Sequence, residues 1–308
     1  MTTILYSHAD CLAHDTGFGH PESAERLDAL LERLSDQEFS PLERRAAPPA
    51  ARVQISRVHD AYYIDKVFAA VPASGEAHIS PDTIVCGEST GAFMRAAGAV
   101  CAAVDAVLGG QAQNSFCAVR PPGHHAATAT TMGFCVFNNV VVGVEQARKV
   151  HGLKRVVVID FDVHHGNGTE AIFRKDPDVM VASIRQAMIF PMSGASRDTG
   201  VGNIVNVPVA RNTPAAKFRQ AFEAGIIPRL LDFKPELLFI LAGFNAHFND
   251  PLANQKLAPS DFAWLTEQIM SVAKKCCQRR VVSTLEGGYD PAALAQSGAA
   301  HIRTLMQP

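Results

Sequence analysis

Asp160, Asp162 and His164 stand at alternate positions in the segment VIDFDVHH. Alternate residues of an extended segment project to the same side. Carboxylate and imidazole groups of this kind are ligands for Zn²⁺ or a similar divalent ion, and the remaining carboxylate can orient a neighbouring histidine. Because the set ends an apolar run, its ionisable groups must be paired or bound to a metal. The spacing therefore predicts a metal site at the end of a buried strand.

Two adjacent histidines, His124 and His125, follow a second apolar run in the segment RPPGHHA. Neighbouring residues of a strand point to opposite faces, but a Pro-Pro-Gly turn breaks that alternation and allows both rings to face one cavity. An isolated pair of histidines is more often a feature of a surface loop. The neighbouring motifs, and not the pair alone, favour a functional site.

Polar groups follow two further apolar runs. LAGFNAHFNDPL presents Asn245 and Asp250, and LEGGYD presents Tyr289 after two glycines. A lone tyrosine after two glycines is usually part of a turn. Four polar strand ends in one chain are harder to attribute to turns, and they predict one site built at one edge of a sheet.

The elements that must position these residues alternate along the chain. Short β-branched runs cover residues 2–7, 114–120, 154–162, 178–184, 236–244 and 279–288, and helical patterns cover residues 20–34, 87–110 and 260–276. Continuous apolar strands are buried on both faces, which indicates a parallel sheet covered by helices. We expect one α/β domain over residues 1–308, with ligands bound beyond the carboxyl ends of the strands.

The helical segments carry terminal signals. Glu22 and Ser23 stand at the start of the first, the second ends in Gly109 and Gly110, and the third has Ser260 and Asp261 as capping candidates and Lys274 and Lys275 in its last turn.

Composition narrows the class of protein. The net charge of −2 gives no electrostatic case for a nucleic-acid or membrane partner. The seven cysteines are scattered and form no C-x-x-C pair, so we expect reduced thiols. We find no signal-peptide pattern and no apolar run of membrane-spanning length. We expect a cytoplasmic protein, and the sequence is compatible with a homo-oligomer.

Taken in order, these segments resemble the histone deacetylase superfamily, in its bacterial class II-like and acetylpolyamine-amidohydrolase-like branch. The matching segments are HPESAERL, DT at residues 82–83, RPPGHHA, GFCVFNN, VIDFDVHHGNGT, GVGNIVNVPV, AGFNAHFNDPL and LEGGYD. The resemblance implies the arginase/deacetylase fold, with a mostly parallel central sheet flanked by helices. It also implies zinc-dependent hydrolysis of an acylated amine by a metal-activated water.

The resemblance assigns the proton-handling groups. It makes His124, hydrogen-bonded to Asp160, a largely electrostatic group. It makes His125, oriented by Asn167, the general base and later the general acid. Tyr289 would donate a hydrogen bond to the substrate carbonyl and to the developing oxyanion.

The resemblance also assigns two ion sites and a channel. One catalytic zinc ion would be held by Asp162, His164 and the residue at position 245. A structural potassium ion would be held near this strand, through backbone oxygens at Asp160, Asp162 and His164 and by Ser183 and Ile184. The channel residues would be Gly133, Phe134, Phe190, Leu252 and Gly288.

Two positions depart from the family pattern. The family has Asp where this chain has Asn245, so the zinc site loses one anionic ligand and the metal is undercompensated. Loss of a group that only supports the ligands costs roughly 10- to 100-fold in affinity or activity, so loss of a ligand costs at least that. Arg185 stands where relatives carry His, and we expect an altered entrance to the site.

The remaining alternatives concern activity and substrate. The leading hypothesis is a zinc-dependent amidohydrolase with impaired activity, and the second is a weak or inactive protein that binds acyl-lysine or an acylated amine. An arginase-like binuclear hydrolase would need a D-x-D motif where this chain has FNAH. Leu252 stands where polyamine-selective relatives place an acidic residue, which favours acyl-lysine peptides or uncharged amides over polyamines.

Overall fold

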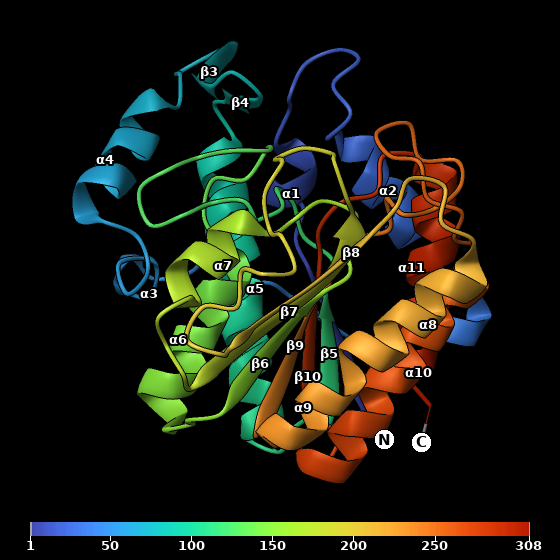
Figure 1. Ribbon diagram of the computed structural model, residues 1–308. Helices are drawn as coiled ribbons and strands as arrows, with labels where there is room; N and C mark the ends of the chain where they lie inside the picture. Colours follow the sequence, from blue (N-terminus) through green and yellow to red (C-terminus); the bar gives the residue numbers. More distant parts are fainter. Residues whose placement is uncertain (1, 308) are drawn as a thin grey trace.

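Eight strands form one sheet in the computed structural model, which describes residues 2–307 (Figure 1). Their order is β2-β1-β5-β10-β9-β6-β7-β8, and every neighbouring pair is parallel. The strands are β1 (Thr3–Ser7), β2 (Glu43–Ala46), β5 (Asn114–Cys117), β6 (Val156–Asp160), β7 (Val179–Gln186), β8 (Ile204–Val209), β9 (Leu237–Ala242) and β10 (Val281–Leu285). The predicted parallel α/β sheet is confirmed.

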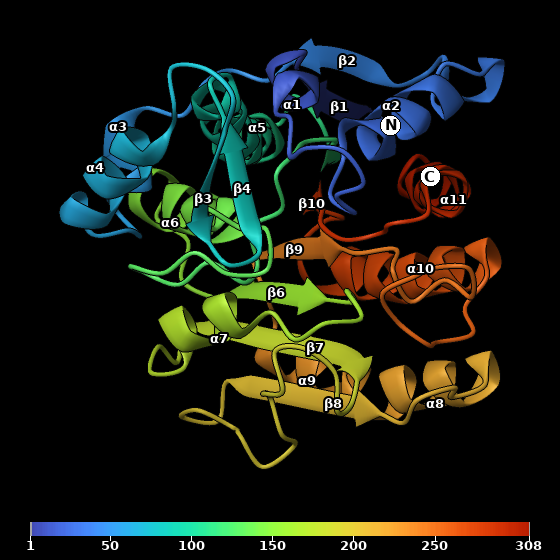
Figure 2. The same ribbon diagram turned by 90° about the horizontal axis from the view of Figure 1, so that it is seen from above.

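Helices cover both faces of this sheet (Figure 2). One face carries α5 (Ser89–Leu108), α6 (Asn139–His151) and α7 (Asn167–Phe173), and the other carries α2 (Ala24–Arg33), α8 (Ala215–Gly225), α9 (Ile227–Phe233), α10 (Pro259–Cys276) and α11 (Pro291–Leu305). Every residue of β6, β9 and β10 is buried. Burial on two faces explains why these strands read as unbroken apolar runs.

Shorter elements lie around this core. They are α1 (Asp10–Ala13), the 3₁₀ turn η1 (Gln37–Phe39), α3 (Arg52–Ile55), α4 (Ala61–Ala70) and an antiparallel hairpin of β3 (Glu76–Ser80) and β4 (Thr83–Cys86).

The helix ends match the sequence signals in part. Ser23 is the residue before α2, but its side chain makes no capping hydrogen bond. α5 ends at Leu108, followed by Gly109, as predicted. Of the two capping candidates of the third helix, Ser260 is wrong, because α10 begins at Pro259 and its N-cap is Ala258. Asp261 lies in the first turn, and its side chain contributes to capping by accepting the backbone N–H of the N-cap Ala258 at 2.8 Å.

Helix α5 corrects the expectation that no apolar segment is long enough to span a membrane. By length and composition its 20 residues are apolar enough to cross a membrane. In this fold most of the helix is buried, and it packs against α6, β5 and α1. Its apolar character is therefore accounted for by the core of the protein.

Candidate active site

Four neighbouring strands, β5, β10, β9 and β6, end at the same edge of the sheet. The chain leaving each of them supplies the polar segments that the sequence singled out. His124 and His125 follow β5, Tyr289 follows β10, Asn245 follows β9, and Asp162 follows β6. Parallel strands bring segments that are far apart in sequence to one place, and ligands bind at this edge in open α/β sheets.

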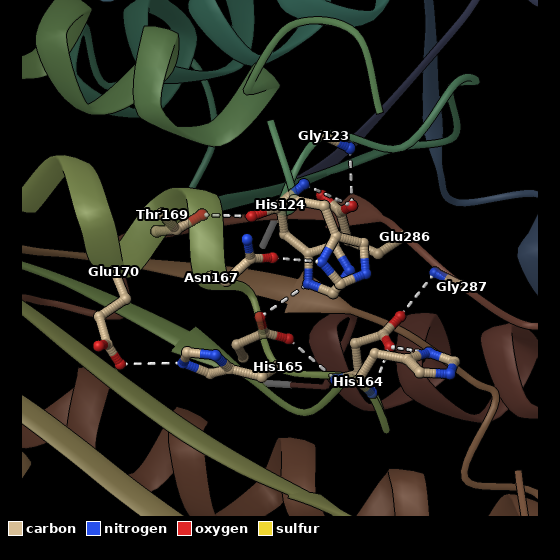
Figure 3. Close-up of polar contacts among 12 residues, drawn as sticks. Gly123, His124, His164, His165, Asn167, Thr169, Glu170, Glu286 and Gly287 are labelled. Carbon is tan, nitrogen blue, oxygen red and sulfur yellow. Dashed lines mark hydrogen bonds and ion pairs between the residues drawn. The ribbon is translucent and has the colours of Figure 1, made fainter. Parts of the chain in front are cut away.

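The two histidines contact different partners. Nδ1 of His124 lies 2.9 Å from Oδ2 of Asp160, and Nδ1 of His125 lies 2.7 Å from Oδ1 of Asn167 (Figure 3). The two imidazole centroids are 4.0 Å apart. An amide oxygen can only accept, so Nδ1 of His125 carries the hydrogen and Nε2 keeps a free lone pair.

These contacts separate the charges of the two rings. Burial alone lowers the pKa of His124, but the carboxylates of Asp160 and Asp162 outweigh it and raise that pKa to about 10. Burial lowers the pKa of His125 well below its usual value, and the adjacent His124 cation acts in the same direction. The site therefore combines a cationic His124 with a neutral His125.

The three predicted zinc ligands lie together, but Asn245 directs its side-chain NH₂ group toward Asp162 and His164. Nδ2 of Asn245 lies 2.8 Å from Oδ1 of Asp162 and 3.2 Å from Nδ1 of His164, while Oδ1 of Asn245 accepts the backbone N–H of Val163 at 2.8 Å. An amide NH₂ donates hydrogen bonds and offers no lone pair to a cation. Among residues 2–307, no group of three or more His, Cys, Asp or Glu side chains is placed to hold a metal ion. In this arrangement the donor set does not fit Zn²⁺.

The predicted potassium residues are also adjacent. Asp160 on β6 pairs in register with Ser183 on β7, and Ile184 is the next residue. Ser183 Oγ is buried and has no hydrogen-bond partner among residues 2–307. An unpaired buried hydroxyl beside a carboxylate is compatible with a bound monovalent cation.

A cavity of about 220 Å³ opens onto this site. Four of the five predicted channel residues line it, with His125, His164 and Tyr289 among the other lining residues. The ring of Phe190 lies 5.2 Å from His125 between centroids, and the ring of Phe134 lies 5.8 Å from Tyr289. The two phenyl rings therefore border the polar end of the cavity.

Some lining residues differ from the prediction. Gly288 is not among the described residues that line the cavity; its carbonyl instead accepts a hydrogen bond from Nε of Arg26 at 2.5 Å. Asp82 and Ile189 do line the cavity. The carboxylate of Asp82 accepts the N–H of Gly133 at 2.9 Å, so it fixes the channel wall. The DT motif marked Asp82, whereas no sequence pattern distinguished Ile189 from a core residue.

Two other residues lie away from the cavity. His165 contacts Glu170 at 2.9 Å (Figure 3). Its other ring nitrogen lies 2.8 Å from Oγ of Ser193. Arg185 is buried, which corrects its expected place at the entrance, and Nη2 donates to the carbonyl of Ser193 at 2.9 Å. Both residues therefore hold the loop that carries Phe190.

Two carboxylates to which the sequence analysis assigned no catalytic role support the site. Oε2 of Glu286 accepts the N–H groups of Gly123 and His124, at 2.8 and 3.2 Å (Figure 3). Oδ2 of Asp250 accepts the N–H of Tyr289 at 2.7 Å. Burial raises the pKa of Glu286 to about 7 and that of Asp250 to about 6. These groups position the backbone on which the histidines and the tyrosine stand.

Comparison with known proteins gives consistent similarities. The model of the histone deacetylase domain matches residues 20–305. The chain is 38% identical to a histone deacetylase-like amidohydrolase of Pseudomonas aeruginosa, over 93% of this chain and 77% of that protein. It is 34% identical to the human polyamine deacetylase HDAC10, over 99% of this chain and 48% of that protein. The crystal structure of the HDA15 HD domain matches with a TM-score of 0.93 and 29% identity, over 99% of this chain and 88% of that one.

Proposed function

Because this chain belongs to the histone deacetylase family, we propose that it binds the acyl group of an acylated amine in the 220 Å³ cavity and hydrolyses the amide only slowly. One observation carries the proposal: the cavity has aromatic walls, and it reaches His125 and Tyr289 but also the site closed by Asn245. The family relatives include deacetylases and an amidohydrolase. Binding and turnover are therefore separable questions for this chain.

Acyl-lysine side chains and small uncharged amides are the substrates that we propose. Phe134 and Phe190 border the cavity with apolar surface, which suits a methylene chain. Leu252 lines the cavity and carries no charge for a second ammonium group. The carboxylate of Asp82 is already engaged by the N–H of Gly133 and the hydroxyl of Ser80. We therefore favour acyl-lysine over acetylated polyamines.

The residues present can orient the amide and move a proton. The phenol of Tyr289 donates a hydrogen bond to the acyl oxygen, where negative charge develops. Nε2 of His125 accepts a proton from the attacking water and returns it to the departing amine. The cationic His124 stabilises the negative charge that accumulates between these groups. A bound zinc ion would polarise the carbonyl and lower the pKa of the attacking water; with Asn245 as placed, we propose that this assistance is lost and turnover is slow.

Turnover of an acetyl-lysine peptide and of an acetylated polyamine tests the proposal. We expect little hydrolysis by the chain as it stands, and at least about 10- to 100-fold more after Asn245→Asp in the presence of zinc, because an anionic ligand is restored. Asn249→Asp, at an exposed position in the same loop, is the matched control. An Asn245→Asp protein that takes up zinc yet hydrolyses no acyl amide would refute the assignment.

A second function, acyl-amine binding without turnover, is favoured by the hydrogen bonds of Asn245 to Asp162 and Val163. Equilibrium binding of an acetyl-lysine peptide labelled with a fluorophore, with no hydrolysis over hours, would support it. Zinc-dependent turnover by the unchanged chain would exclude it.

We also propose a structural potassium ion near Ser183, because its buried hydroxyl lacks a partner among residues 2–307. Potassium should then raise the melting temperature more than sodium does at equal ionic strength. Ser183→Ala should reduce that difference.

A further inference from the structure

We infer that Asn245 closes the metal position as a hydrogen-bonded plug, with its side-chain NH₂ in place of a cation, and is not a weakened metal ligand. This inference concerns the site of the proposed function and rests on its family assignment, but it requires no substrate. The alternative, in which the amide oxygen faces the metal, makes opposite predictions.

The backbone of Val163 determines which way the amide faces. An N–H can only donate, and the N–H of Val163 lies 2.8 Å from Oδ1 of Asn245. Both residues are buried, with exposures of 1% and 0%. If the amide were reversed, its NH₂ would face this N–H, and a buried donor would lose its partner. The amide oxygen is therefore committed to Val163, and the NH₂ must face Asp162.

The NH₂ group satisfies the side chains that would otherwise hold a metal. It donates to Oδ1 of Asp162 at 2.8 Å and lies 3.2 Å from Nδ1 of His164. The N–H groups of His164 and Gly287 donate to the two oxygens of Asp162, each at 2.9 Å. Asp162 thus accepts three hydrogen bonds within the protein, and these stabilise its negative charge without a bound metal ion.

The surrounding backbone lies close to the hydrogen-bonded side chains of Asn245 and Asp162. A Cβ added to Gly287 would lie 2.1 Å from Nδ2 of Asn245, and one added to Gly243 would lie 2.1 Å from Oδ2 of Asp162. The backbone therefore encloses the hydrogen-bonded pair on two sides. A metal ion at this position would have to displace the NH₂ from its hydrogen bond to Asp162.

Aspartate at position 245 would differ from asparagine both in the metal-bound and in the metal-free protein. One carboxylate oxygen can accept the N–H of Val163 while the other faces the metal, so no buried donor is lost. Without a metal, however, two buried carboxylates would face each other at the distance that now separates Asn245 from Asp162, and like charges at close range destabilise each other. The amide therefore favours the metal-free protein, and the carboxylate favours the metal-bound one.

The substitution Asn245→Ala distinguishes between the two interpretations of Asn245, as a hydrogen-bonded plug or as a weak metal ligand. Asn245→Ala removes the oxygen and the NH₂ together and leaves room for water, which can coordinate a metal. If Asn245 is a plug, zinc affinity rises in the order Asn, Ala, Asp. If its oxygen is a weak ligand, the order is Ala, Asn, Asp.

The experiment is a zinc titration of the unchanged chain and the two variants, all metal-stripped, against a chromophoric chelator, together with melting temperatures in EDTA. We expect Asn245→Asp to bind zinc at least about 100-fold more tightly than the unchanged chain, with Asn245→Ala between them. In EDTA the unchanged chain should melt above both variants. If Asn245→Ala fails to fold, Asn245→Ser provides the same comparison.

Two results would overturn the inference. One is weaker zinc binding by Asn245→Ala than by the unchanged chain, and the other is a higher melting temperature in EDTA for Asn245→Asp than for the unchanged chain. Neither measurement uses a substrate. Failure of the plug is therefore distinguishable from failure of the proposed acyl-amine binding.

Discussion

At the residue scale, two adjacent histidines of the site differ in charge because the Nδ1 atom of each ring contacts a different partner. Asp160 offers a carboxylate to His124, whereas Asn167 offers a neutral amide oxygen to His125. A carboxylate stabilises the imidazolium, and an amide oxygen fixes the tautomer without adding charge. His125 therefore keeps a lone pair on Nε2 at neutral pH, as a proton acceptor requires.

His125→Ala tests this role in the zinc-loaded Asn245→Asp protein. We expect kcat to fall by about 100- to 10,000-fold with a small change in KM, because a positioned general base contributes that much to the rate. His151→Ala, which removes a histidine at the end of α6, should leave both constants unchanged. Equal effects of the two substitutions on an acetyl-lysine peptide would contradict the assignment.

The sequence predicted which residues gather at the site better than how they contact one another. Spacing indicated Asp160, Asp162 and His164, and the family resemblance added position 245; motif order and strand ends suffice for that. The orientation of the Asn245 amide depends on the N–H of Val163, and a backbone donor leaves no trace in the residue types. Asp250 stood in a quoted motif, yet its bond to the N–H of Tyr289 joins two loops that are distant in sequence.

At the element scale, a buried ion cluster connects α2 to two of the loops that build the site. Glu22 receives Nε of Arg120 at 2.6 Å and Nη1 of Arg26 at 2.7 Å, and all three side chains are buried. Arg120 precedes the Pro-Pro-Gly turn. Arg26 also donates to the carbonyl of Glu286 at 2.6 Å and lies 4.8 Å from the ring centroid of Tyr289. The cluster therefore fixes both the histidine turn and the tyrosine loop relative to α2.

Glu22→Gln should lower the free energy of unfolding by about 3–5 kcal/mol, because removal of one partner leaves buried guanidinium charge uncompensated. Urea unfolding followed by circular dichroism measures this. Glu25→Gln, at an exposed position in the first turn of α2, is the matched control and should change stability by less than about 0.5 kcal/mol. Similar losses in the two variants would argue against a special role of the cluster.

The same cluster predicts a pH dependence. Burial alone would raise the pKa of Glu22, but Arg120 and Arg26 outweigh it and lower that pKa from 4.5 to about 2. A depressed folded-state pKa means that the contribution to stability is complete above about pH 4.5 and is lost as the pH falls towards 2. The stability difference between the unchanged chain and Glu22→Gln should therefore shrink across this window. A difference that stays constant in urea titrations between pH 5 and 3 would contradict this assignment.

Helix α5 approaches the N-terminal region closely at Gly98. A Cβ there would lie 2.0 Å from the carbonyl oxygen of Pro48, so Gly98→Ala should cost about 1–3 kcal/mol through displaced backbone. At Gly91 in the same helix the nearest atom is a side-chain oxygen of Asp10 at 3.2 Å. Gly91→Ala should be neutral or stabilising by up to about 1 kcal/mol, since alanine is the better helix former. Thermal unfolding of both variants tests these two predictions. Equal melting temperatures of Gly98→Ala and Gly91→Ala would contradict them.

Central elements were predictable from the sequence, and peripheral ones were not. The six predicted strands all exist, because burial on two faces requires continuous apolar runs. β2 was missed because its sequence is ERRA, and as an edge strand it has no second neighbour to bury it. β8, at the opposite edge, carries Pro208, which a central strand would not tolerate.

At the scale of the whole molecule, burial governs the chemistry of the thiols. Six of the seven cysteines are buried, and Cys276, at the end of α10, is partly exposed. Burial raises the pKa of the Cys11 thiol to about 11 and that of Cys101 to about 12, so little of the reactive thiolate forms.

A thiol reagent with a chromophoric leaving group should therefore titrate about one group quickly in the native protein and all seven in denaturant. Cys276→Ser should abolish the fast phase. A fast phase that persists in this variant would show that another cysteine is accessible.

The position of β10 in the sheet has a consequence for biosynthesis. β10 comes after every other strand in chain order, yet it lies between β5 and β9. Until the ribosome has released residue 285, β5 and β9 each have an edge without its final partner, and unpaired edges of apolar strands promote aggregation. Nascent chains that stall before β10 should therefore depend on chaperones. An N-terminal fragment that ends before β10 should not bring the segments of His124, Asn245 and Tyr289 together in one site.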